Sequence, residues 1–563
     1  MLSSMVVRTL AGLALAQAGR WRARFLYHTR HAERIQQRLL QHILHQHRHT
    51  AFGRDHSFSR IRTLQDYRRH VPIHRYEDLD HYMLRVRQGD TSALLADGRL
   101  HMFALTSGTT ASRKFIPVTR RYLKDYRRGT NIWARGIFEK YPNAFLKNIL
   151  QLVSDWDEFR TESDVPCGSI SGLTAHMQRK SVRKYYSLSA ITGKVKDATS
   201  RLYLALRMGL ISSELGVLGS ANPSTFIKMA QMLESYSEDL IRDLRDGTLS
   251  GTQKIPDDVR AALQHDLKKL PERARQLETI RSKAGKLLPM DAWKIHTIAC
   301  WTGGSVGLYL KQFPHYFGNT PIRDLGLLAS EGRFTIPLEE GTSAGVLDIS
   351  SHFYEFIPEG EIQSPQPVVL TAAELEEGRN YYLLPTTAYG LYRYNIYDVV
   401  RMVGKCHQTP MVEFLSKGSL FSNLTGEKLS EFQVVAAMKQ ASVRWGYLPS
   451  AYTIAPYFDE RLPGYSLYLE EQDINHVPAE KLAMEFDQCL REQNMEYDTK
   501  RESQRLNMLE VCVMPRNTWS QWDAARVAKT GGSTEQYKRP CLINDVQFKA
   551  TMPVVRSVLG QAR

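Results

Sequence analysis

His101-Met-Phe-Ala-Leu-Thr-Ser-Gly-Thr-Thr-Ala-Ser-Arg-Lys114 joins a short apolar run to a loop of hydroxyl side chains. The apolar part predicts a strand. Gly108 lets the backbone approach a phosphate closely, while the hydroxyls, the backbone N–H groups and Lys114 offer hydrogen bonds and positive charge. The loop is not a Walker A motif, because Arg113 stands where that motif has glycine. The stretch therefore indicates either a phosphate-binding loop or an ordinary polar turn.

Two later segments each place a carboxylate beside a predicted strand. Leu328-Ala-Ser-Glu-Gly332 follows an apolar strand, and Glu331 at that strand end is suited to hold Mg²⁺ against phosphate oxygens. Tyr392-Arg-Tyr-Asn-Ile-Tyr-Asp-Val-Val-Arg401 puts Asp398 at the start of a strand, where an acceptor can take both hydroxyls of a ribose. Taken singly, Glu331 is equally consistent with a surface carboxylate, and Asp398 with a strand cap.

Predicted strands and helices alternate through most of the chain. Residues 120–140 have the apolar spacing of a helix, and residues 224–245 and 257–284 are helical and heavily charged. Strands are predicted at 293–300, 321–328, 345–357, 380–385 and 398–404. This alternation indicates an α/β fold with mixed sheets.

The composition changes at Lys417 to Gly426, a loop rich in Ser, Gly and Asn. Beyond it we predict helix, strand, strand, helix, strand and helix, at 430–444, 451–457, 465–470, 479–493, 507–514 and 518–528. A chain of 563 residues is also too long for one small core. The sequence therefore predicts a large domain over residues 1–425 and a smaller α+β domain over 426–563.

Charge and cysteine content restrict the protein class. The six cysteines have no paired spacing, which favours reduced thiols and a cytoplasmic protein. The net charge is +15, yet no nucleic-acid-binding motif accompanies it, so we expect no nucleic-acid partner. Met5 to Ala18 is apolar but shorter than the roughly 20 residues of a membrane span. We predict a helix packed on the domain and no integral membrane segment, with an export or membrane-surface role as the alternative.

In this order and spacing, the three motifs resemble the GH3 acyl-acid amido synthetase family, a branch of the adenylate-forming enzymes, with a bacterial-type member as the expected match. The resemblance runs along nearly the whole chain. It includes Thr50-Ala-Phe-Gly-Arg-Asp-His56 near the start. It also includes Thr530-Gly-Gly-Ser-Thr-Glu-Gln-Tyr-Lys-Arg-Pro540, which is similar to the family's C-terminal Gln-Tyr-Lys loop. The likeness implies a large mixed-sheet α/β adenylation domain followed by a smaller α+β domain.

The resemblance also implies ATP and Mg²⁺ as cofactors. Ser107, Thr109 and Thr110 would hold the ATP phosphates with help from Lys114, and Glu331 would coordinate Mg²⁺ as a catalytic residue. The reaction implied is adenylation of a carboxylic acid with release of pyrophosphate. The acyl group would then pass to an amine, an amino acid being the expected partner, to form an amide.

The remaining implied residues surround the nucleotide and the acyl group. They are Ala329 and Ser330 where the acyl carboxylate meets the α-phosphate, Thr302 and Gly303 beside the adenine, Asp398 at the ribose, and Lys428 near the hinge. Lys538, in the small domain, would move in to neutralise charge at the phosphoryl centre as the second catalytic residue. Closure of the small domain would keep water away from the reactive anhydride.

Three positions depart from the family pattern. Ala111-Ser112 stands where relatives usually have a glycine, which shifts the expected phosphate contacts. Leu327 stands where relatives commonly have an aromatic residue against the adenine. Tyr397 replaces the glycine expected before Asp398.

Other functions remain open at this point. An acyl-CoA ligase of the same superfamily would use the same adenylation chemistry. Gly303-Gly-Ser-Val-Gly307 fits the G-x-S-x-G pattern of a serine hydrolase with Ser305 as nucleophile, and triad partners are available in Asp324, Asp348, His352 and His407. A non-enzymatic nucleotide-binding or scaffold protein is the third alternative, because the departures are also consistent with a degenerate site.

Overall fold

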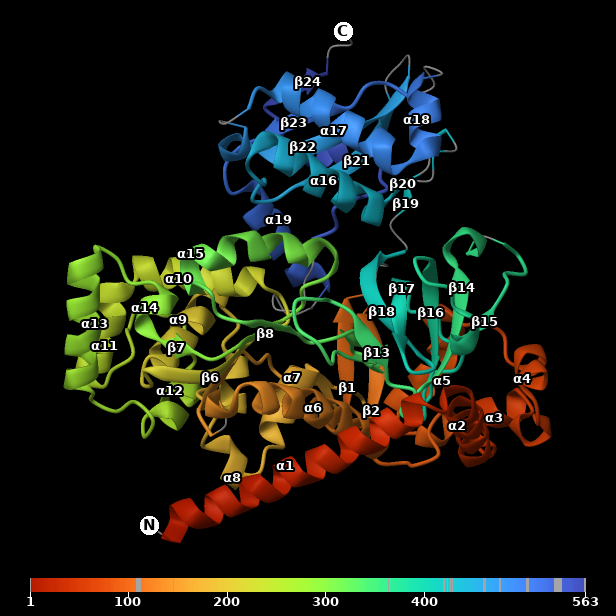
Figure 1. The fold of residues 1–563 in the computed structure, drawn as a ribbon, viewed down its shortest axis with the longest axis horizontal. Coiled ribbons are helices and arrows are strands. Elements are labelled where there is room, and N and C mark those ends of the chain that lie inside the picture. Colours follow the sequence, from red (N-terminus) through yellow and green to blue (C-terminus); the bar gives the residue numbers. More distant parts are fainter. Residues whose placement is uncertain are drawn as a thin grey trace.

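The computed structural model describes residues 2–107, 113–144, 146–362, 364–418, 421–422, 424–425, 427, 429–458, 462–474, 477–502, 506–530 and 539–560. Figure 1 shows a large body that contains the N-terminal and central parts of the chain and a smaller body, in blue, at the C-terminal end. Both bodies combine helices and sheets. The fold is therefore the predicted α/β arrangement with a smaller α+β unit.

A parallel sheet forms one side of the large body. Its strands, in spatial order, are β3 (Asn148–Gln151), β6 (Glu214–Gly219), β8 (Ile298–Cys300) and β9 (Ile322–Asp324), while β7 (Lys294–Ile295) pairs with β6. The helices that share its hydrophobic cluster include α9 (Ala198–Gly209), α10 (Ser224–Ser235), α11 (Ser237–Asp246), α12 (Asp257–Leu263) and α13 (Pro271–Ala284). The loops after β8 and β9 leave from the carboxyl edge of this sheet, where open α/β sheets bind their ligands.

A hairpin and a long helix follow each other at the centre of the large body. Strands β1 (Leu100–Ser107) and β2 (Arg113–Thr119) are antiparallel, and β5 (Pro166–Gly168) runs parallel to β1. Helix α6 (Arg120–Lys140) starts directly after β2, because the Thr119 hydroxyl accepts the Tyr122 N–H at 3.1 Å and caps the helix. Helix α6 therefore follows the β1–β2 hairpin without an intervening loop.

Five α-helices precede the first strand of the chain. They are α1 (Leu2–Thr29), α2 (Ala32–His47), α3 (Ala51–Asp55), α4 (Leu64–His70) and α5 (Tyr76–Arg87). In Figure 1, α1 runs along the lower edge of the molecule, and its Phe25 shares a hydrophobic cluster with Ile132 and Trp133 of α6. Among the described helices, none combines the length and the apolar character that crossing a bilayer requires.

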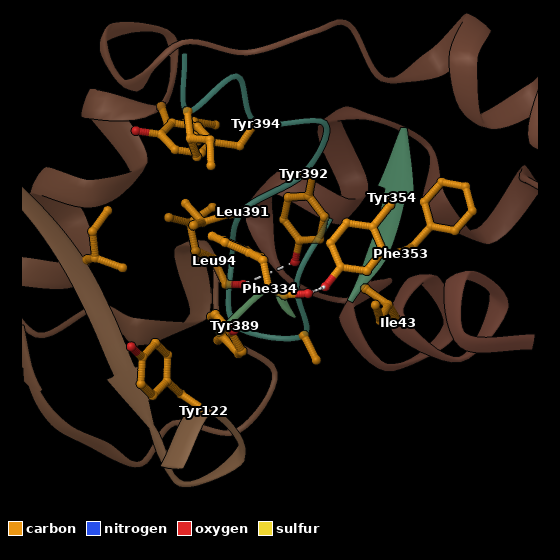
Figure 2. Packing of buried hydrophobic residues seen from close by; sticks show 14 of the residues in the cluster. Ile43, Leu94, Tyr122, Phe334, Phe353, Tyr354, Tyr389, Leu391, Tyr392 and Tyr394 are labelled. Carbon is orange, nitrogen blue, oxygen red and sulfur yellow. Dashed lines mark hydrogen bonds between the residues drawn. The ribbon is translucent and has the colours of Figure 1, made fainter. Parts of the chain in front are cut away.

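An antiparallel sheet completes the large body. Its strand order is β12 (Thr335–Ile336), β13 (Gly345–Leu347), β18 (Thr409–Lys417), β17 (Asp398–Cys406), β16 (Asn380–Thr386), β14 (Phe353–Pro358) and β15 (Leu370–Thr371). Its aromatic side chains pack with those of the N-terminal helices and β1 in one hydrophobic cluster, part of which Figure 2 shows. Asp398 is the first residue of β17, as predicted.

The small body follows the predicted order of elements. Helices α16 (Glu431–Trp445), α17 (Ala479–Gln493) and α19 (Thr518–Thr530) accompany a sheet ordered β21 (Thr453–Phe458), β22 (Pro463–Glu470), β23 (Glu510–Met514) and β24 (Arg556–Leu559). Its core is a separate hydrophobic cluster that runs from Leu429 to Leu542. The division at residues 425 and 426 stays a prediction for the functional domains.

Several predicted elements are divided in the structure. The helix expected at 224–245 breaks at Tyr236 into α10 and α11, and the one at 257–284 breaks into α12 and α13. The strand expected at 345–357 is two strands, because residues 348–352 turn the chain from β13 to β14, which are not neighbours in the sheet. Hydrophobic periodicity continues across such turns, which is why the sequence did not separate the elements.

A buried ion pair fixes the loop between β16 and β17. The Glu355 carboxylate is fully buried and accepts a hydrogen bond from Arg393 Nε at 2.8 Å and another from Arg68 Nε at 2.8 Å. Arg393 also donates to the Val71 carbonyl at 2.8 Å, and its backbone has φ +45°. A buried carboxylate is stable only when its charge is paired in this way.

We expect Glu355→Ala to lower the free energy of unfolding by about 3 kcal/mol or more, because it leaves the Arg393 charge buried without its partner. Urea unfolding measures the change. Glu376→Ala is the matched control, since Glu376 pairs with Arg379 at 2.7 Å with both side chains mostly exposed. That surface pair should contribute no more than about 1 kcal/mol. Equal effects of the two variants would contradict a structural role for Glu355.

Candidate functional site

Strands β1 and β2 flank the predicted phosphate loop in the sequence. Ser107 ends β1 opposite Arg113, so the loop is a hairpin connection rather than a strand-to-helix turn. Thr109, Thr110 and the departure Ala111-Ser112 lie outside the described residues. Lys114 is described, and its Nζ lies 5.5 Å from the centre of the Tyr76 ring. The hairpin therefore brings a cation to the base of the loop.

The acidic motif forms a tight turn beside the hairpin. Strands β10 (Leu328–Ala329) and β11 (Gly332–Arg333) pair antiparallel, so Ser330 and Glu331 form the turn between them. The Ser330 hydroxyl donates to the Leu105 carbonyl at 3.2 Å, and the Tyr122 hydroxyl donates to the Ser330 carbonyl at 3.1 Å. These two bonds connect the acidic turn, with the buried Glu331, to the end of β1 and to α6.

Gly332 has to be glycine in this turn. Its φ is +150°, and a Cβ atom there would lie 2.7 Å from the Tyr389 hydroxyl and 3.2 Å from His352 Nε2. Both neighbours are buried aromatic residues with little room to move. The final residue of the motif is thus fixed by packing rather than by chemistry.

The ribose motif has a backbone conformation that explains one departure. Tyr397 has φ +58°, and its N–H donates to Asn395 Oδ1 at 2.8 Å. This is the left-handed region, which glycine occupies without strain. The glycine expected before Asp398 is therefore a conformational requirement, and Tyr397 adopts the same conformation at some cost. The buried Asp398 still starts β17 opposite Lys417.

The turn predicted to line the adenine pocket is held by Asp324. The N–H and the hydroxyl of Thr302 both donate to Asp324 Oδ2, each at 2.7 Å. A Cβ atom on Gly303 would lie 2.9 Å from Ser343 Cβ, so only glycine fits the turn. The indoles of Trp133 and Trp301 donate to the carbonyls of Asp324 at 2.7 Å and Gly326 at 3.0 Å. These hydrogen bonds fix the turn at Thr302 and the backbone from Asp324 to Gly326.

The other departure, Leu327, is half-buried against the large-body core. Its N–H donates to the Thr335 hydroxyl at 2.8 Å. The backbone of β10 is consequently fixed even though the aromatic residue of the family pattern is replaced.

The alternative hydrolase triad is not assembled from the described partners. Asp324 binds Thr302, as above. His352 is buried, its Nε2 contacts the Arg333 carbonyl at 3.0 Å, and burial lowers its pKa to about 4. His407 Nδ1 shares a hydrogen bond with the Thr29 hydroxyl at 2.8 Å, and Asp348 accepts one from Ser351. The Ser305 side chain lies outside the described side chains. These contacts give the four residues structural roles.

Two predicted lysines of the small body, Lys428 and Lys538, lie outside the described residues, but their neighbours are placed. Glu427 is fully buried and accepts N–H bonds from residues 424 and 425 at 2.7 and 2.8 Å. Arg539 follows Lys538, pairs with Asp523, and lies over the Trp519 ring at 4.8 Å.

The small body contacts the large body beside the adenine turn. The 3₁₀ helix η5 (Gly304–Gln312) follows that turn, and its Lys311 Nζ donates to the Ser442 hydroxyl of α16 at 3.0 Å. Burial raises the pKa of Tyr309, also in η5, and the nearby positive charge of Arg539 opposes this shift. Arg539 therefore lies near η5, and Figure 1 shows α19 at the boundary between the two bodies.

The described residues contain no cluster of three or more His, Cys, Asp or Glu side chains that would hold a metal by themselves. Mg²⁺ is usually bound through one or two carboxylates together with substrate phosphates. The buried Glu331 is one carboxylate of this kind, so the described residues are compatible with a magnesium nucleotide.

Comparison with known proteins identifies the family. The GH3 family N-terminal domain matches residues 22–322, the GH3 central domain matches 345–417, and the GH3 C-terminal domain matches 432–547. The chain belongs to the GH3 family. The matches cover the first and third motifs and the C-terminal loop, whereas the Leu328–Gly332 motif lies between the first two matched ranges.

Similar proteins come from plants. The jasmonoyl–L-amino acid synthetase JAR6 of Nicotiana attenuata is 28% identical over 442 residues, 74% of either chain. The indole-3-acetic acid-amido synthetase GH3.10 of Arabidopsis thaliana is 27% identical over 531 residues, 85% of this chain and 86% of its own.

Solved structures share the fold. The GH3.15 acyl acid amido synthetase in complex with 2,4-DB superposes with a TM-score of 0.83 at 20% identity and covers 97% of this chain and 98% of its own. A 2-hydroxyisobutyryl-CoA ligase superposes with a TM-score of 0.52 at 13% identity, covering 92% of this chain and 90% of its own.

Sequence reasoning found the motif residues but not the groups that position them. Asp324 was considered only as a possible triad member and Tyr122 only as an apolar position of the helix at 120–140, while Glu355 and Tyr76 had no predicted role. Their partners lie 22 to 287 residues away in the sequence. A single sequence holds no signal for such long-range pairs.

We expect Gly332→Ala to destabilise the protein by roughly 2–3 kcal/mol, because it combines backbone strain with a clash against Tyr389. Gly341→Ala is the control: its φ is +72°, and its Cβ would meet no atom within 4 Å. The control should cost only about 1 kcal/mol. Chemical denaturation of both variants gives the difference, and a loss no larger at Gly332 than at Gly341 would contradict the proposed close packing.

Proposed function

We propose that this protein is an ATP-dependent acyl-acid amido synthetase, a ligase that adenylates a carboxylic acid and joins the acyl group to an amino acid. The observation that carries the proposal is the hydrogen bond between Ser330 and Leu105, which connects the acidic turn to the strand leading into the phosphate loop. Family membership and the names of the plant relatives support the same activity.

The proposed nucleotide site uses the residues expected from the sequence. Ser107, Thr109, Thr110 and Lys114 bind the phosphates, Thr302 and Gly303 border the adenine, and Asp398 accepts the ribose hydroxyls. Ala329 and Ser330 lie where the acyl carboxylate approaches the α-phosphate. Lys428 contacts the nucleotide from the hinge. Glu331 is the proposed ligand for Mg²⁺, which supplies Lewis-acid charge when it is bound.

The first half-reaction forms an acyl–phosphate anhydride. A carboxylate oxygen of the acid attacks the α-phosphorus of ATP, and the bond to the oxygen that bridges the α- and β-phosphorus atoms breaks, so pyrophosphate leaves. Both the acid and ATP are anions, so positive groups must screen their repulsion. Lys114 at the hairpin and Lys538 from the small domain are the proposed screening groups in this chain.

The second half-reaction forms the amide. The amine nitrogen attacks the acyl carbon, the carbon–oxygen bond to the phosphoryl group breaks, AMP leaves, and the nitrogen gives up a proton. An amino acid is the proposed acceptor, since the relatives are named for amino acid conjugation, whereas a CoA ligase shares only the general fold. The relatives reported above are plant enzymes, so a bacterial type has no support beyond the sequence resemblance.

We propose that residues 1–425 and 426–563 are the functional domains and that their relative movement brings Lys538 to the site. The support is the hydrogen bond from Lys311 of η5 to Ser442 of α16, because η5 directly follows the turn that we propose borders the adenine. We also propose a cytoplasmic location, since all six cysteines are free thiols.

Turnover with a suitable carboxylic acid should require ATP and Mg²⁺ and should release AMP and pyrophosphate. A coupled pyrophosphate assay over a panel of acids, with and without amino acids, measures this, and reactions without acid give the background. Release of ADP and phosphate would contradict the mechanism, because those products require attack at the γ-phosphorus.

Lys538→Ala should lower the overall rate by roughly 10²–10³, the scale of losing one group that stabilises charge in the transition state. The free energy of unfolding should change by no more than about 0.5 kcal/mol. Lys283→Ala, an exposed substitution in α13, is the control for simple loss of charge. A Lys538 variant that keeps the wild-type rate would remove the support for a lysine delivered by domain movement.

A further inference from the structure

The first half of helix α1 is apolar in composition. Leu2–Gly19 contains eleven apolar residues and one charged residue, Arg8. Apolar residues stand at successive positions, as in Val6-Val7 and Leu13-Ala-Leu-Ala16, so the sequence does not confine them to one helical face. A helix of this composition is normally buried in a protein core or in lipid.

The large body leaves this half largely uncovered at the positions whose side chains the structure describes. Leu15 is half-buried, Ala16 and Gln17 are exposed, and a Cβ atom on Gly12 would meet no atom within 4 Å. The first of the described side chains of α1 to be buried is Ala18. In Figure 1 the N-terminal turns of α1 lie below the other elements of the large body. An apolar helix is therefore presented at the surface.

The second half of α1 is attached to the large body. Trp21 and Phe25 pack in a hydrophobic cluster with side chains of α6. Arg22 forms an ion pair with Glu139 of the same helix. Because α1 is one continuous helix from Leu2 to Thr29, these contacts also fix the direction of its apolar first half.

Positive charge follows the apolar half directly. Residues 1–32 contain five arginines and no Asp or Glu. Two of these arginines, Arg20 and Arg24, are exposed in the second half of α1. The polarity of α1 therefore changes along its axis, from apolar to cationic.

A second group of cations lies at the same edge of the molecule. In the view of Figure 1, α8 (Lys180–Arg183) lies at the lower edge of the large body, as α1 does. Four exposed cations, which we call the α8 cations, form no ion pair with any residue that the structure describes: Arg179, Lys180, Arg183 and Lys184. The exposed Val182 lies among them in the sequence. Cations without acidic partners favour the approach of an anionic surface.

A bilayer that contains anionic lipid satisfies both features. Its interfacial region accepts the apolar half of α1, and its headgroups pair with the cations. A second copy of the chain would bring the same positive charges together, and a nucleic acid offers no apolar phase. The apolar run is shorter than the roughly 20 residues of a membrane span and is interrupted by Arg8. We propose that α1 and α8 form a docking face for the surface of an anionic bilayer.

Vesicle co-sedimentation of the full chain tests this proposal, which is independent of the proposed function. The probes are vesicles of phosphatidylcholine alone and vesicles of phosphatidylcholine mixed with phosphatidylglycerol. The protein should sediment with the mixed vesicles much more than with phosphatidylcholine alone, and added salt should weaken this binding by screening the headgroup charge. Wild-type protein that stays in solution with both vesicles would overturn the proposal. Binding of duplex DNA or a stable dimer would then identify the occupant instead.

Replacing the four α8 cations with alanine should weaken binding to the mixed vesicles by roughly 10²-fold or more, because each cation near an anionic surface adds to the attraction. The matched control removes four exposed cations in and just before α13: Lys268, Lys269, Arg275 and Lys283. The control should bind as wild type does. Equal binding by the two variants would show that α8 is not part of the docking face and would overturn the proposal.

Ala16→Glu places a negative charge in the apolar half of α1. Because Ala16 is exposed, the melting temperature should not change, whereas binding to the mixed vesicles should fall about tenfold or more. Ala262→Glu, at an exposed position of α12, is the control for the added charge. An Ala16→Glu variant that binds the mixed vesicles as wild type does would contradict the role of α1.

Discussion

The site depends on the buried Glu355 carboxylate. It lies in β14 and binds Arg393 in the loop before β17 as well as Arg68 in α4, so one charge connects the central sheet, the motif loop and the N-terminal helices. Arg393 is held at a positive φ by these bonds. The residues after it, from Tyr394 to Asp398, connect this fixed position to the start of β17. The ion pairs of Glu355 thus fix the backbone from which the third motif continues.

The three motifs lie at the ends of strands that belong to three different sheets. The β1–β2 hairpin lies more than 200 residues before the β10–β11 turn and the start of β17 in the sequence, and the hydrogen bond from Ser330 to Leu105 joins the hairpin to the turn. Glycines at 303 and 332 leave room for the side chains of Ser343 and Tyr389, respectively. The small body contacts η5, which follows the turn at Gly303, through Ser442 of α16.

Much of this arrangement was predictable from the sequence, and the limits have physical causes. The order of elements in the small body and the span of α6 follow from hydrophobic periodicity, which local sequence records well. The breaks within 224–245 and 345–357 were missed, because turns interrupt those segments without interrupting their apolar pattern. The motif residues were recognised by resemblance, whereas Asp324, Glu355 and Tyr122 act through partners distant in sequence. The glycine expected at position 397 became intelligible only from the backbone angle of Tyr397.

Two tryptophans lie beside the turn predicted to border the adenine, and their fluorescence can report on it. Trp133 and Trp301 donate their indole N–H groups to the two carbonyls that flank Leu325, within the loop that Asp324 holds. Trp301 is half-buried and adjoins Thr302, so its emission reflects the polarity of that turn. Because the chain has only eight tryptophans, replacing Trp301 with phenylalanine isolates its share of the spectrum. Binding of the proposed nucleotide at this turn can then be followed by fluorescence without any attached dye.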